Sequence, residues 1–361
     1  MTPAAIRDTV LAANEARTPL EIIGHGSKRR IGKPMEGTPL DLSKLSGVNF
    51  YEPEELVLSA KAGTPLTEIE KLLAKHGQEL AFEPMDYGHL LSGKNNPGTI
   101  GGVLATNTSG PRRLKMGATR DHILGVEAVT GRGDLFKSGG RVMKNVTGYD
   151  LSKGLAGSWG TLAVITDVTF KVLPAAETET TLLIRGLEDD VAALTMAAAM
   201  GSSAEASSTA HLPYTVAGNV LGGALKGETA TLIRIEGFPV SVKARVDALA
   251  KMLSIKSETI EERQSRSLWR EIRDCIPFAD GGNRPVWRVS LAPMAGHAFV
   301  ADLRLHAAVD AFYDWQGGLV WLRIDGAPEA EAIRALVKKR GGGHATLIRA
   351  NEDERRAIPV F

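Results

Sequence analysis

Apolar residues in the first part of the chain follow two periodicities, which predict alternating helices and strands. Residues 3–16 form an amphipathic pattern typical of a helix, and residues 20–23 form a short apolar run that ends in glycines, as a buried strand does. Alternating apolar residues over 56–60 predict a second strand. A helix follows in "LTEIEKLLAKHG", whose apolar residues share one face and whose end is at Gly77.

From residue 82 to residue 173 the pattern changes to short apolar runs separated by glycines, which is typical of strands joined by tight turns. Residues 121–139 predict a hairpin with its turn at 131–134. Pro174 and the polar stretch "AAETETT" then interrupt the pattern. We place a domain boundary there, at residue 175.

The part beyond this boundary repeats one order of elements. The segments "TTLLIRGLEDDVAALTMAAAMGSS" and "TATLIRIEGFPVSVKARVDALAKML" each predict a strand, a loop and a helix. Further strands are expected at "RPVWRVSLAP" and "GGLVWLRIDG", before a last helix in "APEAEAIRALVKKRGGG". This pattern predicts an α+β domain built on an antiparallel sheet. No tandem sequence repeat of fixed period is visible.

Charge and cysteine content exclude several classes of function. Lys and Arg number 43 against 42 Asp and Glu, so the chain has no excess of positive charge for nucleic acid or an anionic membrane. The single cysteine, Cys275, excludes an internal disulfide, and any iron–sulfur cluster would need another chain. No apolar run approaches the ~18 residues of a transmembrane helix. Because the first residues also lack a secretory apolar core, we expect a cytoplasmic protein.

Three glycine-rich segments are the candidates for chemistry: "IIGHGSKRRIG", "NNPGTIGGVLATNTSGPRRL" and "GYDLSKGLAGSWGTLAVIT". Glycines let backbone N–H groups approach an anion closely, and the second segment adds Asn, Thr and Ser donors. The first segment matches neither the dinucleotide G-x-G-x-x-G motif nor a Walker loop. A turn, a bend or a helix–strand joint would explain each segment by itself. Three such segments in one half of the chain predict an extended cofactor lying across the first domain.

These segments, in this order and together with "AGTPLTEIE", "GGRVMKNVTGYDLSK" and "GGGHAT", resemble the vanillyl-alcohol oxidase (PCMH-type) FAD-binding superfamily over nearly the whole chain. Within it they are most similar to the FAD-binding subunits of bacterial glycolate oxidases. The resemblance implies an α+β protein. Residues 1–175 would form a PCMH-type FAD-binding domain of two α+β subdomains, and residues 176–361 a ferredoxin-like α+β cap domain. Relatives continue past "GGHAT" into a tail that folds back on the FAD domain, and here we expect that tail to be absent or shortened.

The resemblance also implies the residues that contact FAD. Gly24, His25, Gly26, Ser27 and Lys28 would hold the pyrophosphate. The other residues assigned to the cofactor are Pro84, Gly98, Thr99, Ile100, Gly101, Gly102, Thr106, Asn107, Ser109, Gly110, Arg120, Asp121, Gly157, Gly160, Thr161 and Ile165. Some members tether FAD to a histidine near the first loop. Ser27 occupies that position here, so we expect non-covalent FAD.

The residues expected to use the flavin are mostly missing. Catalytic relatives that act on 2-hydroxy acids carry H-x-G-x-G-N-x-H in the second domain, but the matching strand "DWQGGLVWLRIDG" has no histidine. The downstream E-H-G-I-G motif is reduced to Gly343 and His344. His344 therefore has two readings: an acid–base group over the flavin, or a structural histidine at a glycine turn. We expect no metal site, and structural roles for His76, His89, His122, His211 and His306.

By resemblance, the expected function is that of the FAD-binding subunit of a complex that oxidises glycolate to glyoxylate, and also D-lactate to pyruvate. A larger FAD-containing subunit would carry most of the chemistry, and electrons would pass to an iron–sulfur subunit. Any contact with the inner membrane would be peripheral, through the complex. Two alternatives stay open: a self-sufficient FAD-dependent oxidoreductase acting on a small 2-hydroxy acid, and a structural subunit with a decayed active site.

Overall fold

The N-terminal part is built on a five-stranded antiparallel sheet in the order β3-β4-β8-β6-β7. The structure, a computed structural model, describes residues 1–141 and 149–360, so part of the "GGRVMKNVTGYDLSK" motif lies outside the described residues. The strands of this sheet are β3 (Val48–Glu52), β4 (Val57–Lys61), β6 (Ile123–Thr130), β7 (Leu135–Gly139) and β8 (Ala163–Lys171). The pairing of β6 with β7 confirms the predicted hairpin and its turn.

Helices and a second layer cover the two faces of this sheet. One face packs Leu58, Val168 and Phe170 against α2 and α4, because alternate strand residues point to the same side. The other face packs Val129 and Val164 against α1 and a small parallel pair, β1 with β2. These elements are α1 (Pro3–Glu15), β1 (Leu20–Ile23), β2 (Thr38–Asp41), α2 (Leu66–Ala74), β5 (Gln78–Glu79), α3 (Gly88–Ser92), α4 (Ile100–Thr106), α5 (Arg113–Met116), α6 (Thr119–His122), α7 (Leu151–Leu155) and β9 (Leu173–Pro174). The helix predicted to end at Gly77 is α2.

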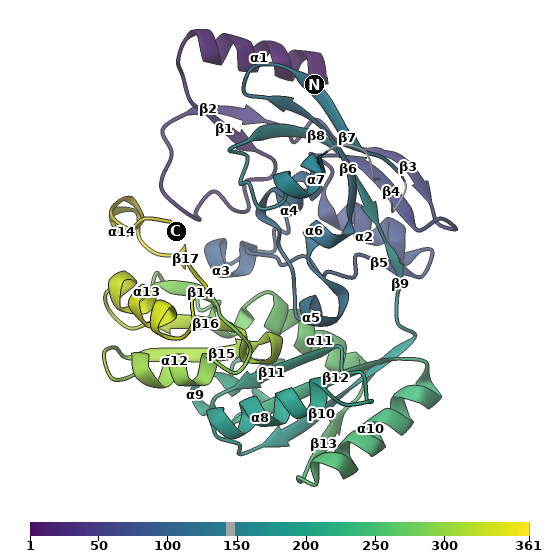
Figure 1. The fold of residues 1–361 in the computed structure, drawn as a ribbon, viewed down its shortest axis with the longest axis vertical. Helices are drawn as coiled ribbons and strands as arrows, with labels where there is room; N and C mark the ends of the chain where they lie inside the picture. Colours follow the sequence, from purple (N-terminus) through teal and green to yellow (C-terminus); the bar gives the residue numbers. More distant parts are fainter. Residues whose placement is uncertain (142–148, 361) are drawn as a thin grey trace.

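The C-terminal part is one antiparallel sheet of eight strands, in the order β13-β10-β12-β11-β15-β16-β14-β17. It lies below the first part in Figure 1. Its elements are β10 (Thr178–Arg185), α8 (Asp189–Met200), β11 (Ser208–Leu212), α9 (Tyr214–Ala217), η1 (Leu221–Gly223), β12 (Ala230–Gly237), α10 (Pro239–Leu253), β13 (Glu258–Ile260), α11 (Glu262–Arg273), η2 (Ile276–Phe278), β14 (Val286–Ser290), α12 (Gly296–Leu303), β15 (Val309–Asp314), η3 (Trp315–Gly317), β16 (Leu319–Ile324), α13 (Ala330–Lys339), β17 (His344–Arg349) and α14 (Glu352–Ala357).

Two halves of this sheet have the same connectivity. The first runs β10-α8-β11-β12-α10-β13 and the second β14-α12-β15-β16-α13-β17. Each is a β-α-β-β-α-β unit whose strands lie in the spatial order 4-1-3-2, the ferredoxin-like arrangement. The halves join edge to edge through β11 and β15, where His211 pairs with Tyr313. The sequence has no repeat that would have indicated this duplication.

One apolar core belongs to both parts of the chain. Met85, Tyr87 and Leu90 from the N-terminal part pack in the same buried cluster as Trp321 and Ile348 from the eight-stranded sheet. The four helices of the duplicated units cover the other face of that sheet, in two further clusters. The interface is therefore a true hydrophobic core rather than a polar contact between independent domains.

A buried cluster of charges crosses the same interface. Arg112 forms ion pairs with Glu79 and Glu83 of its own part and with Glu236 on β12 of the other part. Arg234, also on β12, donates to Glu83 at 2.9 Å. Burial alone would raise the pKa of Glu83, but Arg234 and Arg112 together lower it to about 2. The carboxylate is thus held ionised between two arginines that come from opposite sides of the interface.

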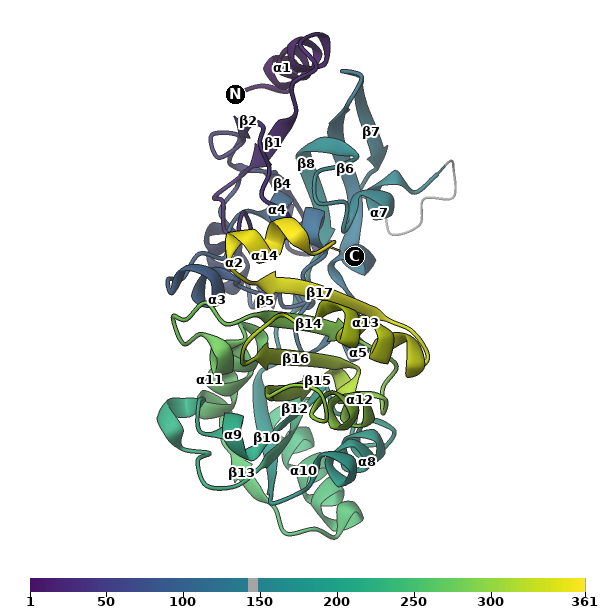
Figure 2. The ribbon, with the colours of Figure 1, turned by 90° about the vertical axis from the view of Figure 1, so that its left-hand side faces the viewer.

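The last described residues return to the N-terminal part. Figure 2 shows α14 lying between β17 and the loop that follows β1. Arg355 Nε donates to the Gly32 carbonyl oxygen at 2.8 Å, and Arg356 lies 3.4 Å from Glu36. We expected this tail to be absent or shortened, and a tail of this length still reaches the first domain. Among the residues described, no helix is long and apolar enough to cross a membrane.

Candidate functional site

A groove of about 390 Å³ runs along the N-terminal part, between the loop after β1, the side of α4 and the start of β8. It collects parts of all three glycine-rich segments. The predicted cofactor residues that line it are Gly24, His25, Gly26, Ser27, Lys28, Thr99, Gly101, Gly102, Thr106, Gly160, Thr161 and Ile165. Val360 of the returning C-terminal segment also lines the groove. The strand before the first loop, β1, is half-buried rather than buried, because its residues border this groove.

The missing side chains of several glycines allow the first loop and the second segment to touch. A Cβ at Gly24 would lie 2.5 Å from the Thr99 hydroxyl oxygen, and one at Gly98 would lie 2.5 Å from Ser27 Oγ. Both distances are too short for a real side chain, and Gly98 also has a positive φ of 82°. From the sequence we attributed these glycines to approach of the cofactor. The structure gives them a second role, because they let the first loop pack directly against the second glycine-rich segment.

Gly102 is different, because its open side faces the groove. It belongs to α4, whose first turn is capped by Thr99 accepting a hydrogen bond from Gly102 N at 3.4 Å. A Cβ at Gly102 would meet only Thr99 Oγ1, at an ordinary contact distance of 3.5 Å. The fold therefore does not require glycine here, whereas a ligand lying close to α4 would.

Lys28 brings a positive charge into the groove. Its Nζ donates to Ser27 Oγ at 3.2 Å, and the described residues form no ion pair with it. Burial lowers the pKa of Lys28 to about 8, and the more distant carboxylate of Asp86 only partly opposes this. A half-buried ammonium group without a paired anion is costly, so the site fits a ligand that carries negative charge.

The third glycine-rich segment is tied to α4 by its backbone. Gly157 N donates to the Leu104 carbonyl at 3.1 Å and Trp159 N to the Ala105 carbonyl at 2.8 Å. These bonds set Trp159 and Gly160 along the groove. The buried Ser158 hydroxyl has no hydrogen-bond partner among the residues described, which leaves it free to donate or accept. Sequence reasoning had not singled out Trp159.

Other predicted cofactor residues lie outside the groove and have structural partners. Asn107 Oδ1 accepts a hydrogen bond from Arg120 N at 3.0 Å, and Asp121 accepts one from Ala118 N at 2.8 Å. Gly110 leaves no room for a Cβ beside Glu83, and its carbonyl accepts a hydrogen bond from Trp315 Nε1 at 2.9 Å. The predicted residues that the structure does not place in the groove wall are Pro84, Gly98, Ile100, Asn107, Ser109, Gly110, Arg120, Asp121 and Gly157.

His344 also lies outside the groove, on the exposed start of β17. It pairs with Ser290 of β14, and Arg288 two residues away on β14 pairs with Thr346. Since side chains two residues apart on paired strands share a face, His344 and Arg288 are diagonal neighbours on one face of the sheet. The register places His344 beside a second group of polar residues that the sequence did not reveal.

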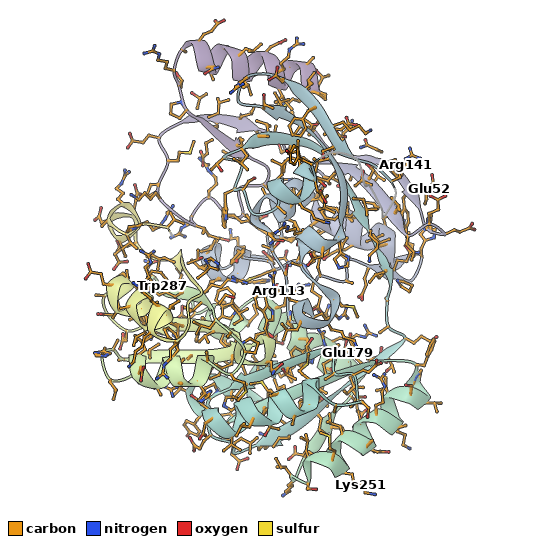
Figure 3. All side chains as sticks on the ribbon, in the orientation of Figure 1. Glu52, Arg113, Arg141, Glu179, Lys251 and Trp287 are labelled. Carbon is orange, nitrogen blue, oxygen red and sulfur yellow. The ribbon has the colours of Figure 1, made fainter. Side chains whose placement is uncertain are left out.

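That second group lies where the two parts of the chain meet. Arg113, on α5, and Arg288, on β14, each lie 4.8 Å from the centre of the Trp315 ring, measured from the guanidinium carbon. In Figure 3, Arg113 lies at the level where the upper and lower ribbons meet. The two arginines are 175 positions apart in sequence and belong to unrelated motifs. No sequence signal could have paired them.

The residues of the groove fit the chemical groups of a flavin dinucleotide. Such a ligand is long and carries a diphosphate, so it needs a cation, backbone amides and a surface free of bulky side chains. Lys28 supplies the cation, the loop at residues 24–28 supplies amides, and Gly102 leaves the side of α4 open. When bound, FAD would supply redox chemistry by accepting two electrons.

Comparison with known proteins also indicates that the chain binds FAD. The family model described as "FAD binding domain" matches residues 1–139. Glycolate oxidase subunit GlcE of Escherichia coli (strain K12) is 33% identical over 352 residues, which is 96% of this chain and 87% of that protein. Glycolate oxidase subunit GlcD of Bacillus subtilis (strain 168) is 34% identical over 184 residues, 51% of this chain and 38% of that protein. The structure of p-cresol methylhydroxylase superposes with a TM-score of 0.69 at 14% identity, covering 98% of this chain and 80% of that one.

Fold and groove together define an FAD-binding protein that has the fold of p-cresol methylhydroxylase and FAD as its cofactor. The chain belongs to the family of glycolate oxidase subunit GlcE.

Proposed function

We propose that this chain is the FAD-binding subunit of a glycolate oxidase (glycolate dehydrogenase) complex, which oxidises glycolate to glyoxylate. A larger catalytic flavoprotein subunit would work beside it, and electrons would pass toward an iron–sulfur subunit. The observation that carries the proposal is the groove, with its half-buried Lys28 and its open face at Gly102, in a chain of the GlcE family. A cytoplasmic location, with peripheral membrane contact through the complex, belongs to the same proposal, as does the domain division at residue 175.

The proposed cofactor residues fall into two groups, those that line the groove and those that lie outside it. Lys28 and the amides of residues 24–28 would hold the diphosphate, while Gly102, Thr106 and Gly160 would border the rest of the cofactor. The predicted residues outside the groove would act indirectly, by fixing the loops that carry the first set. We propose non-covalent binding, so acid denaturation should release all of the flavin from the protein.

The experiment is expression of the chain alone and together with its two partner subunits. The purified chain should be yellow and carry close to one FAD per chain. Glycolate with a redox dye should give little turnover with the single chain and full turnover with the complex. A colourless chain that refuses added FAD would contradict the cofactor assignment, and robust turnover by the isolated chain would contradict the subunit role.

A self-sufficient 2-hydroxy-acid oxidoreductase is the second candidate. It is favoured by one observation, the placement of His344 on the same sheet face as Arg288. In that case His344 would act as the acid–base group. Rapid reduction of the bound flavin by glycolate in the isolated chain, lost in His344→Gln, would support this candidate over the first.

A further inference from the structure

The paired arginines at the domain interface form a site that the groove does not explain. Arg113 and Arg288 come from opposite parts of the chain and approach one indole ring, Trp315. Both guanidinium carbons are 4.8 Å from the ring centre, so they are at most twice that distance apart. Neither side chain has a hydrogen bond or ion pair to a carboxylate within residues 1–141 and 149–360.

This absence of partners is unusual for arginines at this interface. Arg112, the neighbour of Arg113 in sequence, is paired with three glutamates, and Arg234 is paired with two. Arg113 and Arg288 are half-buried, yet the carboxylates that oppose the lowering of their pKa, Asp121 and Asp314, make no ion pair with them. Two like charges held together in a partly desolvated place repel each other unless an anion lies between them.

The neighbouring groups limit what that anion can be. The Trp315 ring forms a flat apolar wall, and its Nε1 is already bonded to the Gly110 carbonyl. Tyr87 is buried in the same apolar core as Trp315. His344 shares the sheet face of Arg288. Two N–H groups of a guanidinium can donate to the two oxygens of a planar carboxylate. The N–H groups that remain on the two arginines can donate to a neighbouring hydroxyl or oxo group.

The second glycine-rich segment connects this place to the groove. Its first half, including Thr99, Gly101 and Gly102, lines the groove, and its last part holds Gly110, which accepts the Trp315 hydrogen bond. One short stretch of backbone therefore touches both sites.

We propose that Arg113 and Arg288, beside Trp315, form a binding site on this chain for a small 2-hydroxy or 2-oxo monocarboxylate. The choice of that class among carboxylates rests on the proposed function. The site needs both parts of the chain, because each contributes one arginine. The isolated chain therefore binds the acid itself, whether or not it turns it over.

The test measures binding to the full-length chain, whose flavin content is determined separately. Calorimetric titrations use glycolate and glyoxylate, with glycolamide as the probe that keeps the hydroxyl and lacks the charge. Sulfate at equal ionic strength controls for general anion binding. We expect the acids to bind at one site, and glycolamide and sulfate to bind at least ten-fold more weakly. Comparison of glycolate with glyoxylate separates a substrate site from a product site.

The variants are Arg113→Met, Arg288→Met and Arg113→Lys, with Arg132→Gln as control because Arg132 is exposed in the β6–β7 turn. Each Met variant should weaken binding ten-fold or more, since a charge-assisted hydrogen bond is lost. Arg113→Lys should bind the acids with an intermediate affinity. Arg132→Gln should bind them as tightly as the wild-type chain. Without any acid, the Met variants should melt at or above the wild-type temperature, because one of two repelling charges is gone.

Two results would overturn the proposal. One is an FAD-loaded wild-type chain that binds none of the acids. The other is a clear fall in the melting temperature of both Met variants, which would show that the arginines serve packing. Binding of the acids to a chain that takes up no FAD would instead refute the proposed cofactor role and leave this site standing.

Discussion

At the scale of single residues, the groove separates glycines that the fold needs from one that it does not. Gly24 and Gly98 are required because the first loop and the second segment would collide through any Cβ. Gly102 has room for a methyl group and still lacks one. Lys28 likewise keeps a half-buried charge that no ion pair of the described residues uses. Residues that are unfavourable or unnecessary for folding are the ones to test for function.

Gly102→Ala should separate stability from cofactor binding. The substitution should stabilise the chain by up to about 1 kcal/mol, because alanine favours the helix α4. It should also lower FAD affinity by roughly ten-fold, about 1.4 kcal/mol, if the ligand lies against α4. Gly154→Ala is the matched control, since Gly154 lies inside α7, has open space around it and does not line the groove. Equal FAD affinity in both variants would contradict the assignment.

Lys28 should make cofactor binding depend on pH. A diphosphate stabilises the ammonium form, so binding takes up a proton once the pH exceeds about 8, the pKa of the free chain. The dissociation constant of ADP, used as a probe, should be flat below that pH and rise above it, by up to about ten-fold per pH unit.

The stability of the free chain should show the opposite trend. The folded pKa of Lys28 lies below its ordinary value of 10.5, so the unfolded state binds more protons between about 8 and 10.5. This contribution therefore makes the ligand-free chain more stable as pH rises through that window. Lys28→Met should remove both pH effects, whereas an unchanged ADP profile would show that Lys28 does not meet the phosphates.

At the scale of elements, the charge cluster at the interface fixes how β12 and the loop around Arg112 lie against each other. Arg112 and Arg234 are almost fully buried, and three glutamates share their charge. Removing one partner from such a network lowers the stability of the folded chain strongly, because the remaining charges stay buried without a counter-charge. Replacing the whole network by apolar residues would lower stability far less.

Glu83→Gln should destabilise the chain by about 3 kcal/mol or more, measured by urea unfolding near neutral pH. The pKa of Glu83 is lowered to about 2 in the folded chain, so its contribution is present above the ordinary pKa near 4.5 and disappears as the pH falls toward 2. Glu262→Gln is the control, because its partner Arg266 is a surface i,i+4 neighbour, and it should change stability by less than about 0.5 kcal/mol. Similar losses for both variants would contradict the special role of the cluster.

Much of the element order could be predicted, and what was missed has a physical cause. Periodicity located α1, α2, the β6–β7 hairpin and the strand–helix units of the second part, because each buries one face against a neighbour. The strand β11 was missed, since "STAHL" reads as polar although all five residues are buried. Lys28 and the glycines of the groove were assigned from the family resemblance, and they lie along one groove. The Arg113–Arg288 pair and the contact of Arg355 with Gly32 depend on tertiary distance, and no local pattern encodes that.

At the scale of the whole molecule, the two parts share a core and are not independent folding units. Met85, Tyr87 and Leu90 would face water if the second part were removed, and Arg112 would lose Glu236. The boundary at residue 175 remains a prediction about architecture, and it does not mark a piece that folds alone.

A fragment of residues 1–175 should therefore be insoluble or bind apolar dyes strongly, because it exposes its half of the shared core. The full-length chain should unfold in one calorimetric transition, with FAD raising its midpoint. A soluble fragment that binds FAD with full-length affinity, or two separate transitions of the full chain, would contradict this view. The same fragment should also lack any carboxylate site, as it has no Arg288.

The join between the two ferredoxin-like halves gives the molecule a preferred direction of bending. β11 and β15 meet through the pair His211–Tyr313, whereas most neighbouring strands of this sheet pair over five or more residues. Asp189 reinforces this place, accepting hydrogen bonds from Tyr313 at 2.6 Å and Arg304 at 3.0 Å. This line has the sparsest backbone pairing of the sheet among the described residues, so we expect it to be the most compliant. A crease there would tilt the strand that carries Arg288 relative to β12 and its charge cluster, and it would reach the groove of the N-terminal part through the C-terminal segment that carries Val360.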